Sequence, residues 1–222
     1  MGQFTISPAD SVILVVDPQP TFMPGGELPV PEGDEIVEPG RQFLNRFRDV
    51  QAIVTQDWHP PGHVSFASSH PGRKPFETIE LYGHPQTLWP DHAVQGSATA
   101  QVHPGLPLDR FVLIVRKGFH RDRDSYSAFR ENYGPDGRRI PTGLAGFLRE
   151  KGVKRLVVWG LAYDYCVGWT ALDGREAGFE VAIVTDLTRA VEPERFEEYS
   201  SRYREAGIHL VRSEEVVLDE SG

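Results

Sequence analysis

The sequence predicts an α/β fold, a three-layer α/β/α sandwich around a mainly parallel sheet of roughly six strands. Short apolar runs recur along the chain and read as nearly continuous Val, Ile and Leu, as expected of parallel strands that are covered on both faces. Amphipathic stretches lie between these runs, so strand and helix alternate. No internal repeat or low-complexity linker divides the 222 residues, so we expect one domain over residues 1–222.

The predicted strands are the apolar runs themselves. They cover residues 12–16, 52–55, 111–115, 155–159, 181–185 and 208–211. Helices are expected in the amphipathic stretches at 34–48, 142–151, 165–177 and 193–206, followed by a helical turn near 213–218. In the second of these helices, Thr142 is placed as an N-terminal cap and Gly152 as a stop signal.

Residues 57–109 interrupt this alternation. They carry eight of the 18 prolines and six of the eight histidines, and they show little periodicity. A connection of this length is far longer than usual, and such loops tend to be functional or disordered. Because the segment is rich in aromatics and histidines rather than in Ser, Glu and Lys, we expect an ordered insertion that contributes to an active site.

The composition excludes several classes of function. Lys and Arg number 23 against 32 Asp and Glu, and a net charge of −9 argues against nucleic acid or an anionic membrane as a partner. No run approaches the ~18–20 apolar residues of a membrane span, and the first run lacks the flanks of a signal peptide. The single cysteine excludes a disulfide framework or a multi-cysteine metal site. We therefore expect a cytoplasmic protein that acts on a small molecule.

Polar residues follow four of the predicted strands. Asp17 ends the first, Asp57 and His59 the second, Lys117 the third, and Cys166 comes a few residues after the fourth. Each has an ordinary explanation on its own, as a turn cap, a solvated lysine or a small buried thiol. Ligands of open parallel sheets bind at the carboxyl ends of the strands, so one shared site explains all of them together.

Cys166 is the candidate nucleophile at this edge. It falls near the start of a predicted helix, where the backbone N–H groups and the helix dipole favour a thiolate. The Lys117 ammonium would lower the pKa of the thiol further, and Asp17 could accept its proton. N–H groups at the same helix start could stabilise an oxyanion. These are the components of an acyl-transfer site built on a thiol.

Asp57 and His59 form a candidate metal-binding pair. At the end of a strand, both side chains can face one ion and offer it one oxygen and one nitrogen ligand. Three protein ligands plus water is the usual open arrangement for zinc or iron. The third ligand is left open among the other histidines of the insertion, which are His63, His70, His84, His92 and His103.

The motifs resemble those of the nicotinamidase/pyrazinamidase branch of the isochorismatase-like cysteine hydrolases. They follow one another in the order found in that family and span nearly the whole chain. They are DPQPTFMPGGELPV (17–30), TQDWHPPGHVSF (55–66), LWPDHAVQG (88–96), RKGFHRDRDSYSAF (116–129) and GLAYDYCVGWTALDGREAGFEVAIVTDLTRAV (160–191). The resemblance implies a metal-dependent amidohydrolase that converts nicotinamide, and also pyrazinamide, to the acid and ammonia through a thioester.

The resemblance also implies roles for individual residues. Asp17, Lys117 and Cys166 would form the catalytic triad. The oxyanion hole would use the backbone N–H groups of Ala162 and Cys166, with a cis peptide bond between Leu161 and Ala162.

The metal site implied by the resemblance consists of Asp57, His59 and His92, with waters completing the shell. His63 or Ser65 would lie beside it, in the first or second shell. The expected cofactor is one divalent metal ion, with zinc favoured over iron or manganese. This ligand set accommodates all three.

The remaining implications concern the substrate and the assembly. Phe22 and Trp89 match the aromatics that sandwich the pyridine ring in the family, and Tyr165 lies beside the nucleophile near the same pocket. A homo-oligomer is expected. His70, His84 and His103 are then ordinary loop residues, and the stretch 72–86, which is longer than in the shortest family members, forms a rim that the sequence does not place.

Other readings of the same residues remain open. A hydrolase of carbamoyl amides or ureides would keep Asp17, Lys117 and Cys166 without a metal, and an isochorismatase-type hydrolase could dispense with the thiol. A haloacid-dehalogenase-type phosphatase would need a second acid at position 19, where this chain has Gln19. A binding module without activity is the fourth reading, and the presence of every triad and metal residue type speaks against it.

Overall fold

A computed structural model describes residues 2–219, so the extreme ends of the domain predicted over 1–222 lie outside the described residues. Its centre is a six-stranded sheet in which every pairing is parallel. In spatial order the strands are β11 (His209–Val211), β10 (Glu180–Arg189), β9 (Arg155–Leu161), β2 (Ser11–Val16), β3 (Gln51–Asp57) and β6 (Phe111–Lys117). All six predicted strands are confirmed, and so is the fold class.

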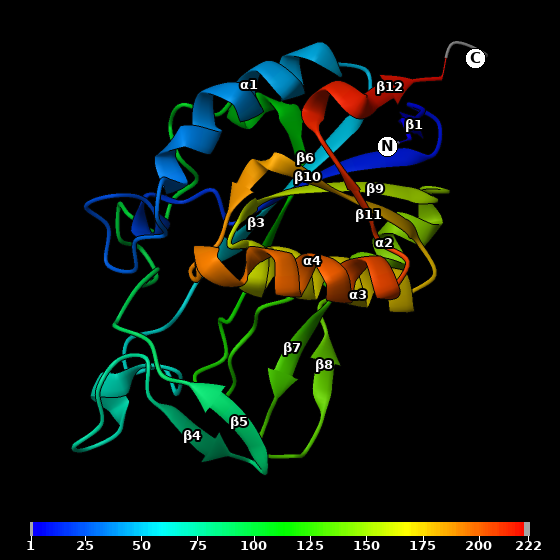
Figure 1. Ribbon diagram of the computed structural model, residues 1–222. Coiled ribbons are helices and arrows are strands. Elements are labelled where there is room, and N and C mark those ends of the chain that lie inside the picture. The colour runs from blue at the N-terminus through cyan, green and yellow to red at the C-terminus, as the bar shows by residue number, and fades with distance from the viewer. Residues whose placement is uncertain (1, 220–222) are drawn as a thin grey trace.

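Helices cover both faces of this sheet (Figure 1). One side carries α1 (Val37–Arg46), and the other carries α2 (Leu144–Glu150), α3 (Gly168–Glu176) and α4 (Phe196–Glu205). The four helices fall within the predicted ranges. Helices α1, α3 and α4 begin later than expected, because 3-10 turns at 33–36 and 193–195 precede α1 and α4, and one turn of π-helix at 163–167 precedes α3. Cys166 therefore lies in this π-helical turn, not in the first turn of α3.

Two apolar cores result, one on each side of the sheet. Alternate residues of β2 divide between them, since Ile13 and Val15 pack on the α1 side, whereas Val12 and Leu14 pack on the side of α2, α3 and α4. Both sides of the strand are thus buried, which is why its sequence reads as continuous hydrophobic residues rather than as an alternation. The rigid centre fixes the carboxyl ends of the strands, where the polar residues follow.

Three small sheets lie outside the centre. The predicted helical turn at 213–218 is wrong in its second half, where β12 (Val216–Leu218) pairs in parallel with β1 (Phe4–Ile6) near the other end of the chain. The insertion expected at 57–109 contains the hairpin of β4 (Thr78–Leu81) and β5 (His84–Thr87).

A second hairpin, of β7 (Arg130–Tyr133) and β8 (Arg139–Pro141), projects on the same side of the molecule as the β4–β5 hairpin (Figure 1). Both hairpins lie beyond the helical layers, next to the loops that leave β3 and β6. Within residues 2–219, no helix has the length and apolar character needed to cross a membrane.

Candidate active site

The carboxyl ends of four neighbouring strands bring the predicted residues together. Asp17 follows β2, Asp57 ends β3, Lys117 ends β6, and Cys166 follows β9 after a four-residue connection. Ligand atoms of Asp17, Asp57 and Cys166 lie within 4.8 Å of one another, and all three residues are buried. The shared site expected from the strand ends is therefore present in the structure.

Lys117 is the centre of this cluster and is completely buried. Its Nζ lies 2.8 Å from Asp17 Oδ2 and 2.5 Å from Asp57 Oδ1. It also donates to the carbonyl of Ser125 at 3.0 Å and lies 3.3 Å from Cys166 Sγ. One ammonium group thus contacts two carboxylates and the thiol, so the charge state of each depends on the others.

Asp17 is held in an unusual backbone conformation. Its φ of 44° is left-handed, which is uncommon for residues other than glycine and costs of order 1–3 kcal/mol. The Thr55 hydroxyl fixes this geometry, because it accepts from the Asp17 N–H at 3.0 Å and donates to Oδ1 at 2.5 Å. The second carboxylate oxygen, Oδ2, then faces Lys117 and has no other hydrogen-bond partner among the described residues.

The electrostatics of the cluster favour a neutral thiol beside a charged lysine. Burial lowers the pKa of an ammonium, but the charges of Asp17 and Asp57 hold the pKa of Lys117 well above its ordinary value. Burial raises the pKa of the Cys166 thiol well above its ordinary value, although the Lys117 charge acts in the opposite direction. The expectation of a lowered thiol pKa is therefore wrong for this state, because desolvation outweighs the nearby ammonium.

The two carboxylates differ in their proton affinity. Burial raises the pKa of Asp17, and the Lys117 charge offsets this only in part. Burial would also raise the pKa of Asp57, but Lys117 and His59 hold it well below its ordinary value. Asp17 is thus the group that can gain a proton, whereas Asp57 stays ionised. Such a separation of two acids identifies their roles in many active sites.

Asp57, His59 and His92 form a site that fits a cation. The Nδ1 of each histidine is held by a carbonyl, His59 by Gly118 at 2.8 Å and His92 by Pro90 at 2.8 Å, so each Nδ1 carries the proton. Both Nε2 atoms then face the same oxygen, Asp57 Oδ2, at 3.2 and 3.5 Å. Burial lowers the pKa of His59, but Asp57 holds it above its ordinary value, which favours a proton on Nε2 when no metal is bound. Three buried ligand atoms that converge on one point suit a divalent metal, which would displace that proton on binding.

His63 and Ser65 lie beside this set, and their side chains form hydrogen bonds outside it. The His63 Nε2 donates to the Arg123 carbonyl at 2.9 Å, and its Nδ1 accepts from the Ser65 hydroxyl at 2.7 Å. Both ring nitrogens therefore have hydrogen-bond partners, although the centroid of the ring lies only 4.1 Å from that of His59. Burial, followed by the His59 charge, lowers the pKa of His63 to about 4, so it is neutral near pH 7.

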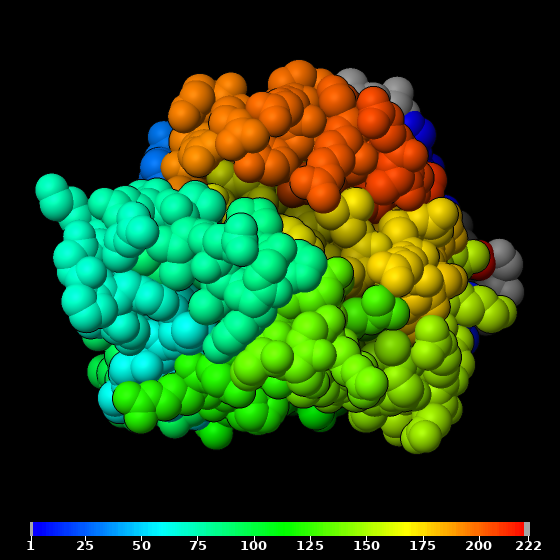
Figure 2. All heavy atoms as spheres, turned by 90° about the horizontal axis from the view of Figure 1, so that it is seen from below, coloured from blue at the N-terminus to red at the C-terminus, as the bar shows by residue number. Residues whose placement is uncertain are grey.

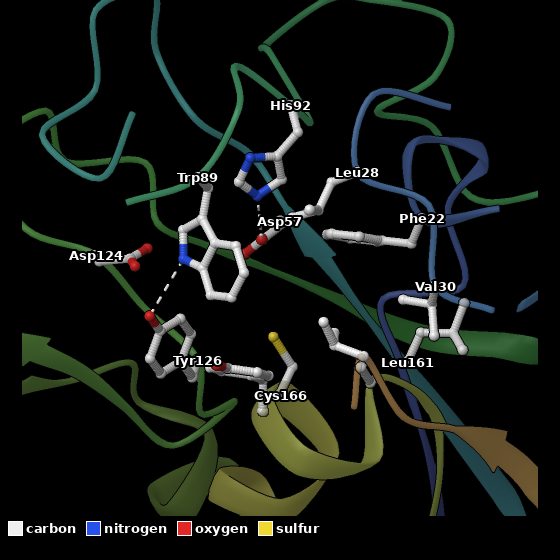
Figure 3. A pocket seen from close by; sticks show the side chains of 13 residues that line it. Phe22, Leu28, Val30, Asp57, Trp89, His92, Asp124, Tyr126, Leu161 and Cys166 are labelled. Carbon is white, nitrogen blue, oxygen red and sulfur yellow. Dashed lines mark hydrogen bonds and ion pairs between the residues drawn. The ribbon is translucent and has the colours of Figure 1, made fainter. Parts of the chain in front are cut away.

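The space above Cys166 is a pocket with aromatic walls (Figure 3). Phe22 and Trp89 stand on opposite sides, Cys166 Sγ points into the gap from below, and Asp57 and His92 lie at the far end. Tyr165 also lines the pocket and packs edge to face on Trp89 at 4.9 Å. A flat ring between the two aromatics would have the thiol at one end and the metal-binding residues at the other.

Ala162 and Cys166 both line the pocket, and the Leu161–Ala162 peptide bond is cis. The Ala162 carbonyl accepts from the N–H groups of Tyr165 and Val167 within the π-helical turn, at 3.1 and 3.0 Å. The connection between β9 and the thiol is thus a tightly hydrogen-bonded turn beside the pocket.

Several residues of the site were not identified from the sequence. Asp124 and Tyr126 line the pocket, and the Tyr126 hydroxyl accepts from Trp89 Nε1 at 3.2 Å, which fixes one aromatic wall. Gln86 Nε2 donates to Asp124 Oδ2 at 2.8 Å. Asp124 and Tyr126 belong to the string DSYSAF, whose letters carry the resemblance but have no periodicity from which their placement follows.

Gln19 is a further residue without an assigned role in the sequence. It is completely buried, and its side chain bonds both backbone groups of Asp57, accepting from the N–H at 2.8 Å and donating to the carbonyl at 2.9 Å. Of the remaining histidines, His70 and His103 make local backbone hydrogen bonds, as expected of loop residues. His84 stacks on Tyr133, away from the candidate metal ligands.

Known proteins are similar to this chain in sequence and in fold. Residues 11–215 match the family model described as the isochorismatase domain. The nicotinamidase of Acinetobacter baylyi is 46% identical over 180 residues, which are 81% of each chain. A nicotinamidase/pyrazinamidase structure from Acinetobacter baumannii superposes with a TM-score of 0.88 at 41% identity, covering 95% of this chain and 99% of that one.

A pyrazinamidase structure from Pyrococcus horikoshii in complex with zinc gives a TM-score of 0.73 at 34% identity, covering 91% of this chain and 99% of that one. The family model spans the sheet, all four helices and the insertion. The chain therefore belongs to the isochorismatase family.

Proposed function

We propose that this protein is a metal-dependent amidohydrolase that converts nicotinamide to nicotinate and ammonia and also accepts pyrazinamide. The observation that carries the proposal is the geometry of one pocket, in which an aromatic slot lies between a thiol and a cation-binding triplet, with a carboxylate that can gain a proton directly beside the thiol. The identity to proteins named nicotinamidase and pyrazinamidase supports the same substrate class.

The first half of the reaction is acylation of Cys166. Asp17 takes the thiol proton as Sγ attacks the amide carbon, which suits a thiol that is protonated at rest and a carboxylate whose pKa is raised. The backbone N–H groups of Ala162 and Cys166 stabilise the oxyanion. Asp17 then gives the proton to the departing nitrogen, so that ammonia leaves and a thioester remains.

The second half is hydrolysis of the thioester. Asp17, again ionised, removes a proton from water, whose oxygen adds to the acyl carbon while the Cys166 sulfur leaves and is reprotonated. Lys117 compensates the charge on Asp17 and on the sulfur throughout, since its Nζ contacts both. One carboxylate thus moves the proton in both halves, which requires that it remain within reach of the sulfur.

Asp57, His59 and His92 would hold a divalent metal, with zinc favoured. When bound, the metal would supply a Lewis acid that orients the ring nitrogen of the substrate. Phe22 and Trp89 hold the ring by its faces, and Tyr126 and Gln86 keep Trp89 and Asp124 in place. The residues at both ends of the pocket then position the carboxamide above Sγ.

The test is ammonia release by purified protein from nicotinamide, pyrazinamide and an N-carbamoyl amino acid, each measured with metal added and after treatment with a chelator. We expect release from the two aromatic amides, with a strong loss in the chelated sample. Release from the N-carbamoyl compound alone, with no effect of the chelator, would instead identify a ureide hydrolase on the same fold.

A further inference from the structure

The edge strand β6 has backbone groups without partners on its outer side. It is the last strand of the central sheet and pairs only with β3. The Lys117 carbonyl accepts from the Trp58 N–H at 2.9 Å, so the backbone of Lys117 faces β3. Because the backbone groups of successive residues alternate between the two sides of a strand, those of Ile114 and Arg116 face outward. Neither residue has a backbone hydrogen bond on that side within residues 2–219.

Exposed apolar side chains are concentrated on and around β6. Seven large apolar side chains are exposed in the described part of the chain, and four of them are Leu108, Val112, Ile114 and Phe119. Val112 and Ile114, which share one face of the strand, are 57% and 47% exposed. Single exposed apolar residues are ordinary, but a group of them along a free edge indicates a contact surface.

This edge has little of the protection that sheets usually give to a free strand, such as shortness, a proline or an exposed lysine. β6 has seven residues, no proline and no acid, and its single lysine is buried. Its one irregularity, a register shift opposite Ala52 and Ile53, lies at its start.

The other free edges are short. β11, at the opposite edge of the central sheet, has three residues, and so do β1 and β12. The strands of the β4–β5 and β7–β8 hairpins have four residues or fewer, and the two hairpins lie next to each other on the face shown in Figure 2. β6 is therefore the longest free edge in residues 2–219.

A groove of about 330 Å³ lies beside β6. Its lining includes Ile114 and Arg116 of the strand and, around the start of α2, Gly143, Leu144 and Phe147. A Cβ added at Gly143 would meet no atom within 4 Å, so this side of the groove is open. The groove thus offers space for an additional strand next to β6.

The sequence of β6 is complementary to itself in one antiparallel register. With Ile114 opposite its counterpart in a second copy, Val112 lies opposite Arg116, and Leu113 lies opposite Val115. Each pair then joins two apolar side chains, or an apolar side chain and the aliphatic stem of an arginine. The two arginines are about 14 Å apart along the strands, which is longer than the Debye length of about 8–10 Å. No like charges meet, so a second copy is a suitable partner for this edge.

We propose that β6 is the interface of a symmetric homodimer, in which two copies of this chain pair their β6 strands antiparallel about a two-fold axis at Ile114. The outward backbone groups of Ile114 and Arg116 then gain partners, and the two six-stranded sheets become one. Because the strands of the two copies run in opposite directions, the pockets above Cys166 lie at opposite edges of the joined sheet. The dimer leaves both pockets open, and the proposal does not depend on the reaction catalysed there.

Sedimentation velocity of the full chain tests for the dimer. We expect a species of twice 24.9 kDa with a Kd of about 10 μM or tighter. Ile114→Lys and Ile114→Glu should each weaken the dimer by at least about tenfold, because like charges directly opposite each other are destabilising. An equal mixture of the two variants should restore the dimer, since opposite charges then face each other. Phe76→Lys, at an exposed apolar residue of the insertion, should leave the Kd unchanged.

Crosslinking through introduced cysteines tests the register. The wild type should give no covalent dimer under mild oxidation, because its one thiol, on Cys166, is buried. Ile114→Cys places two Cα atoms about 5.5 Å apart, which suits a disulfide, so a covalent dimer should form. Val112→Cys, on the same face, places them about 14 Å apart along the strands and should crosslink only when mixed with Arg116→Cys.

Four results would each overturn the proposal. They are a monomer at all protein concentrations, an unchanged dimer in Ile114→Lys, no restoration by the mixture of Ile114→Lys and Ile114→Glu, and equal crosslinking of Ile114→Cys and Val112→Cys. The mixture keeps the test valid if one variant is less stable, since restored pairing requires that both are folded.

Discussion

Replacement of Lys117 by methionine tests the electrostatic centre of the site. Methionine keeps most of the aliphatic volume of lysine but removes the ammonium, so Asp17 and Asp57 would be left buried without their shared counter-charge. Removing one partner from a buried ionic network costs ~3–5 kcal/mol. A domain of this size has a free energy of unfolding of about 5–15 kcal/mol, so the variant should still fold.

The expected loss of stability is large enough to measure by thermal unfolding. One kcal/mol lowers the Tm of a domain of this size by about 2–4 °C, so Lys117→Met should lower it by about 6–20 °C near neutral pH. Lys154→Met, at an exposed lysine, should change stability by no more than about 0.5 kcal/mol. Both are measured after treatment with a chelator, so that bound metal does not contribute.

The loss of stability of Lys117→Met should also depend on pH. Without Lys117, burial raises the pKa values of Asp17 and Asp57 in the folded state above those of the unfolded chain. The folded state then holds protons more tightly, so the cost is fully present at neutral pH and disappears as the pH falls below about 4, where the unfolded carboxyls are protonated too. The reasoning would be refuted if the Tm of Lys117→Met matched that of Lys154→Met. It would also be refuted if the difference in Tm were the same at neutral pH as below about pH 4.

Three further changes probe the remaining contacts. Thr55→Val removes the hydroxyl that donates to Asp17 and lowers its pKa, so the acid limb of kcat/KM should move to higher pH, whereas Thr55→Ser should keep it in place. An unchanged acid limb in the valine variant would contradict the role of ionised Asp17 as the base. Gln19→Leu frees the backbone of Asp57 and should weaken metal binding by about 10–100-fold, measured by titration against a chelator. His92→Ala should leave substoichiometric metal by elemental analysis, and full metal content would exclude His92 as a ligand.

The strands and the strand-end residues could be predicted because the responsible signals are local. A buried parallel strand needs a short apolar run, and its carboxyl end lies at the ligand-binding edge whatever the rest of the chain does. Asp17, Asp57, Lys117 and Cys166 could therefore be brought together from residue order alone. The pairing of β1 with β12 could not, since it joins the two ends of the chain and has no local signature.

The third predicted metal ligand, His92, could not be singled out from spacing, because its position depends on contacts between distant loops. Spacing alone left five histidines open, and the family resemblance singled out His92. In the structure, the His59 N–H donates to the Ala93 carbonyl at 3.0 Å, and Ala93 has a left-handed φ of 46°. These contacts turn His92 toward Asp57, and no periodicity in a Pro-rich segment encodes them.

The pKa of the Cys166 thiol could not be predicted from the sequence. The proximity of Lys117 to Cys166 was predicted, and the 3.3 Å contact is present. The direction of the pKa shift was wrong, because a sequence does not state how completely a residue is buried, and desolvation is the largest influence on Cys166. A thiol that is protonated at rest must lose its proton during the reaction, so the proposed mechanism depends on Asp17 as the base.

The most direct test of the central claim is the rate of ammonia release from saturating nicotinamide by wild-type protein and by Cys166→Ala at equal metal content. The two proteins should have the same far-ultraviolet circular dichroism, since alanine fits the space of a thiol. We expect release from the wild type and a loss of at least about 10⁴-fold in the variant, as for removal of other catalytic nucleophiles. A variant that retains a substantial part of the wild-type rate would contradict the assignment of Cys166 as the nucleophile.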